Sequence, residues 1–362
     1  MTKKIIFTAG GTGGHIFPAI NLMKHFFARG YEVILVTDIR GKKFIKNYPE
    51  FKFYILTAGT PTNKKVLKKF LSIFLIIYSI IKSIIFLKKE KPNLIFGFGG
   101  YVSFPISFSS MFFKIPLAIY ENNMVLGRAN KHLLKISQII FTSKMLLKYF
   151  PIRYSSKICE VGPILEKKII NYDYYNNNNK NKDNLSILVL GGSQGAEIFG
   201  KIIPQTIKML KDKGLILDVK QQCLEVQKKE ITDFYIRNNI KNYVFTFDKD
   251  ILKLISSSNL AITRCGASTT AELAYTLTPF IAVPLPNSID NHQFLNAKYY
   301  EQKGCCWILE QNSFSAEILF NLIIKISNDK NNSKNVKNNL EKICNKNVYS
   351  DIENKINEII QK

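Results

Sequence analysis

The sequence predicts an α/β protein with two domains, each built on a doubly wound parallel sheet, facing each other across a cleft. Short apolar runs alternate with helical stretches along all 362 residues, which is typical of parallel βαβ units. A pattern of strand, glycine loop and helix opens the first half and starts again in the second half. The length is sufficient for about two domains of ordinary size.

In the first half, apolar runs predict seven strands, at 4–10, 32–38, 53–56, 93–99, 117–122, 138–143 and 157–162. The polar, low-complexity stretch 171–184 is interpreted as an interdomain linker or a disordered surface loop. Six more strands are expected, at 186–192, 216–222, 243–247, 259–263, 279–285 and 305–309. We therefore expect domains at 1–165 and 185–349, with a terminal helix over 350–362 that packs back on the first domain.

Composition limits the classes of partner. The net charge is +24, yet only six of the 51 basic residues are arginine. The lysines are dispersed and no nucleic-acid-binding module is recognisable, so nucleic acid is not expected as a partner. The six cysteines and four histidines have no metal-ligand spacing, and no metal site is expected. The charge leaves an anionic lipid surface or an acidic substrate as candidates.

The segment 70–87 is apolar over 18 residues and lies between lysine clusters that extend from 64 to 91. A membrane-spanning helix needs about 20 apolar residues, and this segment contains Lys82. A span here would also separate the first three strands from their sheet, so we reject it. Two alternatives stay open, a crossover helix on the sheet and a helix that docks on an anionic membrane surface, and we favour docking. Residues 1–4 lead directly into a strand and leave no room for a signal peptide, so a cytosolic protein is expected.

The first glycine loop, TAGGTGGHIFPAI at 8–20, predicts a site where a phosphate approaches the backbone at a helix start. It lacks the lysine of a P-loop. It also lacks the third glycine of a dinucleotide fingerprint, because Ile16 stands there, although Asp38 would mimic the ribose-binding acid. The ligand is therefore expected to be a different phosphate compound.

Four further polar segments follow predicted strands, at 120–131, 191–196, 263–272 and 284–297. The first carries an acid with two amides, and the second carries a hydroxyl in a glycine loop. The third has hydroxyls before a glutamate at a helix start, and the fourth has a histidine–glutamine pair. Each alone is explained by caps and turns. Because all of them fall at strand carboxyl ends, where open α/β sheets bind ligands, together they predict a nucleotide-sugar site.

These motifs, GGTGGHIFPA, GFGGYVSFP, ENNMVLGRANK, GGSQGA, CGASTTAE and DNHQFLNA, resemble those of the MurG family over nearly the whole chain. The family transfers N-acetylglucosamine from UDP-N-acetylglucosamine to lipid I, giving lipid II for the cell wall. The resemblance implies a GT-B fold with two Rossmann-like domains and an inverting reaction without an obligatory metal or other cofactor. It also implies peripheral attachment to the cytoplasmic face of the inner membrane, and a part in cell shape and cell division.

The resemblance also implies roles for particular residues. Glu272 would hold the uridine ribose and Gln293 would touch the transferred sugar, while His15 and Tyr101 would face the acceptor. We expect His15 to be the catalytic base, with Glu121 as the second candidate; alternatively His15 only binds the acceptor pyrophosphate. The implied donor contacts, read position by position, are Thr12, Gly13, Gly14, Asn123, Ser193, Ala267, Ser268, Thr269, Thr270, Ala271, Glu272 and Gln293.

Three positions depart from the family pattern. Leu165 replaces a donor-contacting arginine, Asp248 stands near an apolar uracil position, and KQQC at 220–223 replaces H-Q-S-G. Losing a charge-assisted contact would cost about 1.5–3 kcal/mol of donor binding. Alternatives are therefore another enzyme of this fold, either a lipid glycosyltransferase or a UDP-sugar 2-epimerase, and a decayed enzyme kept as a membrane-associated cell-wall scaffold.

Overall fold

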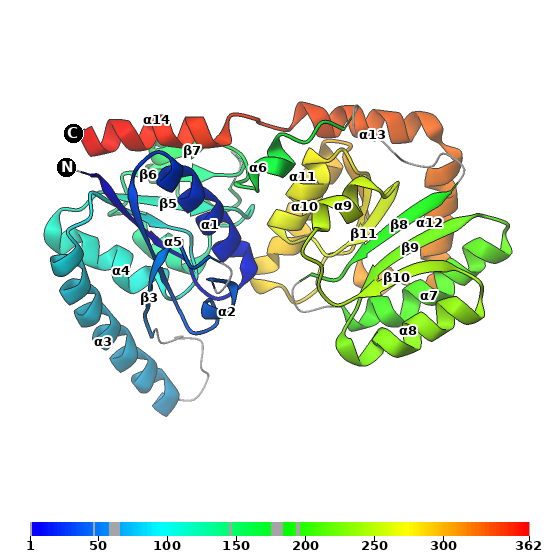
Figure 1. Ribbon diagram of the computed structural model, residues 1–362, viewed down its shortest axis with the longest axis horizontal. Helices are drawn as coiled ribbons and strands as arrows, with labels where there is room; N and C mark the ends of the chain where they lie inside the picture. The colour runs from blue at the N-terminus through cyan, green and yellow to red at the C-terminus, as the bar shows by residue number, and fades with distance from the viewer. Residues whose placement is uncertain are drawn as a thin grey trace. The chain divides into compact units, whose positions relative to one another are not determined.

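The computed structural model describes residues 2–45, 48–57, 66–144, 147–174, 184–192 and 196–361. The chain forms two compact units: unit 1 comprises Met1–Glu166 and Asn345–Lys362, and unit 2 comprises Lys167–Cys344 (Figure 1). The chain therefore leaves unit 1 and later returns to it. The Asn-rich stretch 171–184 lies within unit 2, and its residues 175–183 are outside the described part.

Unit 1 contains a parallel sheet of seven strands in the order β3-β2-β1-β4-β5-β6-β7. The apolar residues of its central strands are completely buried, and Phe7 of β1 lies opposite Leu35 of β2 and Phe96 of β4. The strands are β1 (Lys4–Thr8), β2 (Glu32–Thr37), β3 (Lys52–Ile55), β4 (Leu94–Gly97), β5 (Leu117–Glu121), β6 (Ile139–Thr142) and β7 (Ile158–Glu160).

The helices of unit 1 include one from the far end of the chain. Helix α14 packs on α1, where the His25 Nε2 and Glu353 Oε2 atoms are 2.8 Å apart and the Tyr31 hydroxyl donates to Asn357. The helices are α1 (Gly13–Ala28), α2 (Lys42–Ile45), α3 (Val66–Glu90), α4 (Ser103–Ser109), η1 (Ser110–Phe113), α5 (Arg128–Leu133), η2 (Ile152–Lys157) and α14 (Val348–Gln361).

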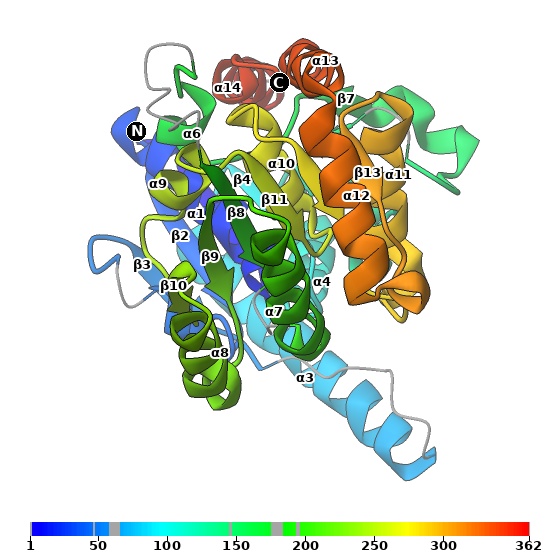
Figure 2. The ribbon, with the colours of Figure 1, turned by 90° about the vertical axis from the view of Figure 1, so that its right-hand side faces the viewer.

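Helix α3 packs on α4 and η1 through its small residues. Ser79 and Ser83 are completely buried, and the Ser83 hydroxyl donates to the Ser79 carbonyl one turn earlier. The opposite side of the helix carries large apolar side chains, and its first half extends away from the sheet of unit 1 (Figures 1 and 2). Among the described residues, no helix is long and apolar enough to cross a membrane.

Unit 2 contains a parallel sheet of six strands in the order β10-β9-β8-β11-β12-β13. Helices α7, α8 and α12 cover one face, and α9, α10 and α11 cover the other (Figure 2). The strands are β8 (Leu185–Leu190), β9 (Leu217–Gln222), β10 (Lys241–Phe245), β11 (Leu260–Thr263), β12 (Phe280–Ala282) and β13 (Cys306–Ile308). The helices are α6 (Lys167–Ile170), α7 (Glu197–Asp212), α8 (Glu225–Arg237), α9 (Ile251–Ser256), α10 (Ala267–Tyr275), η3 (Ile289–Asn291), α11 (His292–Gln302), η4 (Gln311–Ser313), α12 (Ala316–Asn328) and α13 (Lys330–Lys342).

The two parallel sheets confirm the predicted fold class, and all thirteen expected strands are present. Several strands end earlier than predicted, where the chain turns toward a glycine or proline: β1 ends before Gly10 and β12 before Pro284. The Asn/Lys-rich stretch near the C-terminus contains a helix that we did not predict, α13. Val336 and Leu340, one turn apart, are buried, and α13 packs next to α10 and α12.

Candidate functional site

The glycine loop of unit 1 joins β1 to α1. Gly11 has a positive φ of 84°, and no side chain caps α1 at Thr12, so the loop can present backbone N–H groups to an anion. Gly10 of this loop and Gly100 of a second loop, 98–102 between β4 and α4, serve packing instead. A Cβ on Gly100 would lie 2.6 Å from the carbonyl oxygen of Gly10, and a Cβ on Gly10 would lie 2.3 Å from Val102. These two glycines therefore allow the two loops to pack closely together.

His15 and Asn130 flank Gly99 in the second of these loops. A Cβ built on Gly99 would lie 3.1 Å from Cε1 and 3.2 Å from Nδ1 of His15, and 3.7 Å from Nδ2 of Asn130. Gly99 also has a φ of 89°, a conformation that favours glycine. Gly99 thus gives the half-buried His15 ring its place at the carboxyl end of the sheet.

Glu121 is the last residue of β5 and contacts Asn130, and its carboxylate is almost completely buried. Oε1 accepts hydrogen bonds from the backbone N–H and the side-chain amide of Asn123, at 3.1 and 3.3 Å. Oε2 accepts from the backbone N–H of Gly127 at 2.8 Å and from the side-chain amide of Asn130 at 3.1 Å. A carboxylate has about four acceptor positions, and all of them are used to hold the loop after β5.

The remaining residues predicted in unit 1 differ in exposure. Thr12 and Gly14 are exposed, Tyr101 and Asn123 are half-buried, and Gly13 is buried. Asp38 is hydrogen-bonded to its own loop and to the glycine loop. Its Oδ2 accepts two hydrogen bonds from the Arg40 guanidinium, and its Oδ1 accepts from the Gly41 N–H at 2.9 Å and from the Gly11 N–H at 3.5 Å.

Arg40 is a residue that the sequence interpretation missed. Its Nη2 atom lies 3.4 Å from the position that a Cβ would take on Gly11. Nε and Nη2 of Arg40 both donate to Oδ2 of Asp38, at 2.9 and 2.6 Å, and this pair holds the guanidinium beside the glycine loop. The only sequence signal for it is the spacing of an acid and an arginine directly after β2.

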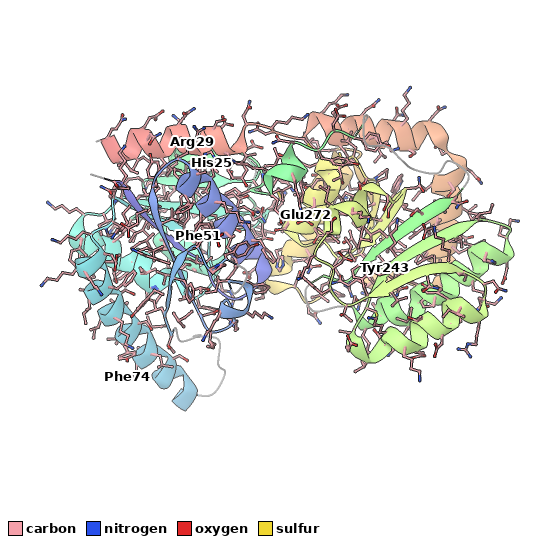
Figure 3. All side chains as sticks on the ribbon, viewed as in Figure 1. His25, Arg29, Phe51, Phe74, Tyr243 and Glu272 are labelled. Atoms are coloured by element: carbon pink, nitrogen blue, oxygen red, sulfur yellow. The ribbon has the colours of Figure 1, made fainter. Side chains whose placement is uncertain are left out.

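In unit 2, the first turn of α10 follows Gly266 with no side-chain cap. Thr270 faces inward, and its hydroxyl donates back to the carbonyls of Gly266 and Ala267. Ala267 and Ala271 are buried as well, whereas Ser268, Thr269 and Glu272 are half-buried. Figure 3 shows Glu272 on this helix. Backbone N–H groups, two hydroxyls and one carboxylate thus lie together at this helix end, where a helix start favours an anion.

Gln293, in the first turn of α11, is held against the turn that precedes α10. Its Oε1 accepts from the backbone N–H of Cys265 at 3.2 Å and of Leu285 at 3.1 Å. The Gln293 amide thus connects the start of α11 to Leu285, eight residues earlier, and to Cys265, 28 residues earlier. Burial raises the pKa of the Cys265 thiol far above its ordinary value, so this cysteine is a neutral packing residue.

Other predicted positions have different surroundings. Ser193 lies outside the described residues. Asp248 accepts a hydrogen bond from the exposed Tyr243 hydroxyl at 2.8 Å, and this bond raises the pKa of Tyr243; Tyr243 is labelled in Figure 3. Leu165 is buried in unit 1, and Lys220 is buried among serines of unit 2. In the described part of the chain, no group of histidines, cysteines and acids could hold a metal ion.

Comparison with known proteins shows the family to which the chain belongs. Residues 5–142 match the glycosyltransferase family 28 N-terminal domain, and residues 186–355 match the glycosyltransferase family 28 C-terminal domain. A UDP-N-acetylglucosamine--N-acetylmuramyl-(pentapeptide) pyrophosphoryl-undecaprenol N-acetylglucosamine transferase from Pelagibacter ubique is 36% identical over 360 residues, 99% of each chain. The same-named protein of Rickettsia felis is 38% identical over 336 residues, which is 90% of this chain and 91% of the relative.

A solved structure agrees with these relatives. The crystal structure of Acinetobacter baumannii MurG superposes with a TM-score of 0.81 at 25% identity, covering 98% of this chain and 99% of the other. The chain belongs to the MurG family of glycosyltransferases. As a MurG-family member it is a family 28 glycosyltransferase, and the resemblance seen in the sequence is confirmed. The motifs that identify the MurG family are the same loops that hold His15, Glu121, Glu272 and Gln293.

Proposed function

We propose that this chain transfers N-acetylglucosamine from UDP-N-acetylglucosamine to the muramyl sugar of lipid I, with inversion, to give lipid II for peptidoglycan. The single observation that carries the proposal is the 36% identity over 99% of both chains to a transferase of that name. The product would feed cell-wall synthesis and hence cell shape and division. The alternative of a UDP-sugar 2-epimerase has weaker support, because the structure of a putative UDP-N-acetylglucosamine 2-epimerase from Listeria monocytogenes is similar at a TM-score of 0.64 but only 12% identical, a likeness of fold alone.

In this proposal, unit 2 binds the donor. The uncapped first turn of α10 receives the diphosphate, since backbone N–H groups and the helix dipole stabilise the charge that grows on the leaving UDP. Glu272, one turn into α10, accepts hydrogen bonds from the ribose hydroxyls. Gln293 offers its amide nitrogen to the sugar, because two backbone N–H groups already occupy its oxygen.

Unit 1 binds the acceptor in this proposal, and His15 is the base that removes the proton of the attacking hydroxyl. Of the two candidates for the base, His15 is favoured, because all acceptor positions of Glu121 are already occupied. Glu121 instead fixes the loop that carries Asn123. The N–H groups at the start of α1, together with Arg40, are suited to the acceptor pyrophosphate.

We also propose that α3 docks unit 1 on the cytoplasmic face of the inner membrane, where lipid I would be found. Six large apolar residues on its outer side are 42–66% exposed: Ile73, Phe74, Ile77, Tyr78, Ile81 and Ile85. Met111 and Phe112 of the adjoining η1 are exposed too. Lys82, Lys88, Lys89 and Lys114 are exposed on the same elements, which suits a surface of anionic lipid. Of the predicted lysine flanks, Lys64 and Lys65 lie outside the described residues.

A transfer assay tests the proposed reaction. Purified protein is given radiolabelled UDP-N-acetylglucosamine and a short-chain lipid I analogue, with UDP-glucose as the control donor. Label should enter the lipid only from the N-acetylglucosamine donor, and Glu272→Gln should abolish most of the transfer. Glu225→Gln, an exposed glutamate at the start of α8, is the matched control and should keep wild-type activity.

The outcome separates the candidate functions. Transfer to lipid establishes the proposed enzyme, whereas interconversion of the labelled UDP-sugar without transfer would indicate an epimerase. Folded protein that binds UDP and transfers nothing would contradict the proposal and favour the non-enzymatic scaffold. To separate the two roles of His15, the pH dependence of kcat/KM is measured for the wild type and for His15→Gln. If His15 is the base, the acidic limb of the kcat/KM profile should disappear in His15→Gln. If His15 only binds the acceptor, the acidic limb should remain.

A further inference from the structure

Arg264 is a buried cation at the carboxyl end of β11, and its guanidinium ties together two loops of unit 2. Its side chain is 7% exposed. Nη1 donates to the carbonyl oxygens of Val283 at 3.1 Å and Pro284 at 3.2 Å, and Nη2 donates to Oε1 of Gln311 at 2.5 Å. The guanidinium carbon also lies 4.9 Å from the ring centroid of Phe199.

No carboxylate of the described residues pairs with Arg264. Burying a charge without a counter-charge is costly, and burial lowers the pKa of Arg264. An apolar residue would fill the same space at smaller cost. All three hydrogen bonds of the guanidinium are accepted by loop residues. The effect of Arg264 is therefore to fix the positions of those loops.

These loops determine how Gln293 is held. The Val283–Pro284 segment continues into Leu285, whose N–H donates to Gln293 Oε1, and Cys265, the neighbour of Arg264, donates to the same oxygen. Asn296 completes the connection, because its amide donates to the Cys265 carbonyl at 3.1 Å. Of the two ends of a side-chain amide, the oxygen alone accepts hydrogen bonds, so the two bonds from N–H groups determine which end of the Gln293 amide is nitrogen.

We infer that Arg264 is a positioning residue for the sugar half of a nucleotide-sugar donor. It fixes the backbone of Val283 and Pro284, and through Leu285 it holds Gln293 so that the amide nitrogen donates to a hydroxyl of the sugar. This inference rests on the proposed function, since it takes Gln293 as a sugar contact. The planar guanidinium donates to three acceptors in fixed directions. A lysine ammonium does not reproduce this geometry.

The experiment compares binding of UDP with binding of UDP-N-acetylglucosamine by calorimetry in Arg264→Lys. Arg237→Lys, which alters an exposed arginine of α8, is the matched control. The Kd for UDP should stay within about twofold of the wild type, while kcat/KM for transfer falls about 10- to 100-fold, because a small displacement of a substrate-positioning group has effects of that size. The preference of the enzyme for UDP-N-acetylglucosamine over UDP-N-acetylgalactosamine should fall together with kcat/KM.

Gln311→Ala is a second variant, which removes one of the three hydrogen bonds of Arg264. It should change the same quantities in the same direction but by less, and it tests the inference if Arg264→Lys does not fold.

Two results would overturn the inference: Kd values for UDP and UDP-N-acetylglucosamine that rise by the same factor, or Kd values for both ligands that stay at the wild-type level in both variants. Failure of the proposed function looks different. In that case the wild type itself transfers no sugar, while the ratio of the two Kd values still reports whether Arg264 acts on the sugar half of the ligand.

Discussion

The carboxylate of Glu121 accepts a hydrogen bond from the side-chain amide of Asn130, and both residues are buried. Asn130 also donates to the backbone carbonyl of Tyr120, so it connects the end of β5 to α5. On the other side, Asn130 lies close to Gly99, which adjoins His15. Glu121 and Asn130 are therefore parts of one support for the loop beside His15.

A double-mutant cycle tests this shared role. Glu121→Gln and Asn130→Ala should each lower kcat/KM by about tenfold, as expected for the loss of a buried charge-assisted hydrogen bond. The double variant should fall little further, because residues of one network are not additive. A much larger loss in Glu121→Gln than in Asn130→Ala, together with loss of the acidic limb of the pH profile, would instead make Glu121 the base.

Replacing Gly99 by alanine should remove activity through His15. A Cβ there would lie about 3 Å from the imidazole ring, and the position has a φ of 89°. Gly30→Ala is the matched control, because Gly30 has a φ of 84° with no atom within 4 Å of the new methyl group. Both variants should lose about 1–2 kcal/mol of stability from the backbone conformation, but only Gly99→Ala should lose kcat/KM. Equal activity in the two variants would contradict the placement of His15.

Lys220 should make the stability of unit 2 increase with pH in the alkaline range. Its ammonium is buried among Ser186, Ser257 and Ser258, and burial lowers its pKa below the ordinary value of 10.5. The unfolded state therefore holds the proton more tightly, so the penalty is fully present below the folded pKa and is relieved as pH rises through it.

Urea unfolding at several pH values measures this effect. The fluorescence of Trp307, the single tryptophan, reports on β13 of unit 2. The difference in free energy of unfolding between the wild type and Lys220→Met should grow in favour of the wild type as pH rises toward 10.5. A difference that does not depend on pH would show that Lys220 is not the group responsible.

The exposed side of α3 should control membrane binding. In the double variant Phe74→Ser and Ile81→Ser, binding to vesicles that contain anionic lipid should fall about tenfold or more, since two exposed apolar side chains no longer insert. Ile152→Ser, at an 88% exposed position in η2, is the control and should bind like the wild type. Binding should also weaken in high salt and on zwitterionic vesicles. Equal binding by the control and the double variant would contradict docking through α3.

The sequence was sufficient to predict the sheets, because buried parallel strands are continuous apolar runs that end at glycine or proline. It did not predict α13, since asparagine and lysine carry little apolar signal and, among the side chains that the structure describes, this helix buries just Val336 and Leu340. Glu121 was expected as a candidate base because an acid at a strand end has the right chemistry. Its four hydrogen bonds come from residues two, six and nine positions later, and their directions depend on the folded loop.

Arg264 was missed for a related reason. It stands in a recognised motif, TRCGASTTAE, but its partners are 19, 20 and 47 residues away. No local periodicity records such contacts. His15 and Glu272 were recognisable from their motifs, whereas the residues that support them became visible only with the structure.

Helix α14 belongs to unit 1, whereas unit 2 is continuous in the chain. Synthesis of unit 1 therefore begins first, but unit 1 is completed after unit 2. A ribosome finishes all thirteen strands, and the whole of unit 2, before the partners of His25 and Arg29 on α14 are made (Figure 3). Until then, the nascent first unit exposes the surface of α1 that α14 later covers. A stalled or prematurely released chain that lacks α14 therefore carries its defect in the domain that was made first, where quality-control proteases would find an uncovered apolar surface.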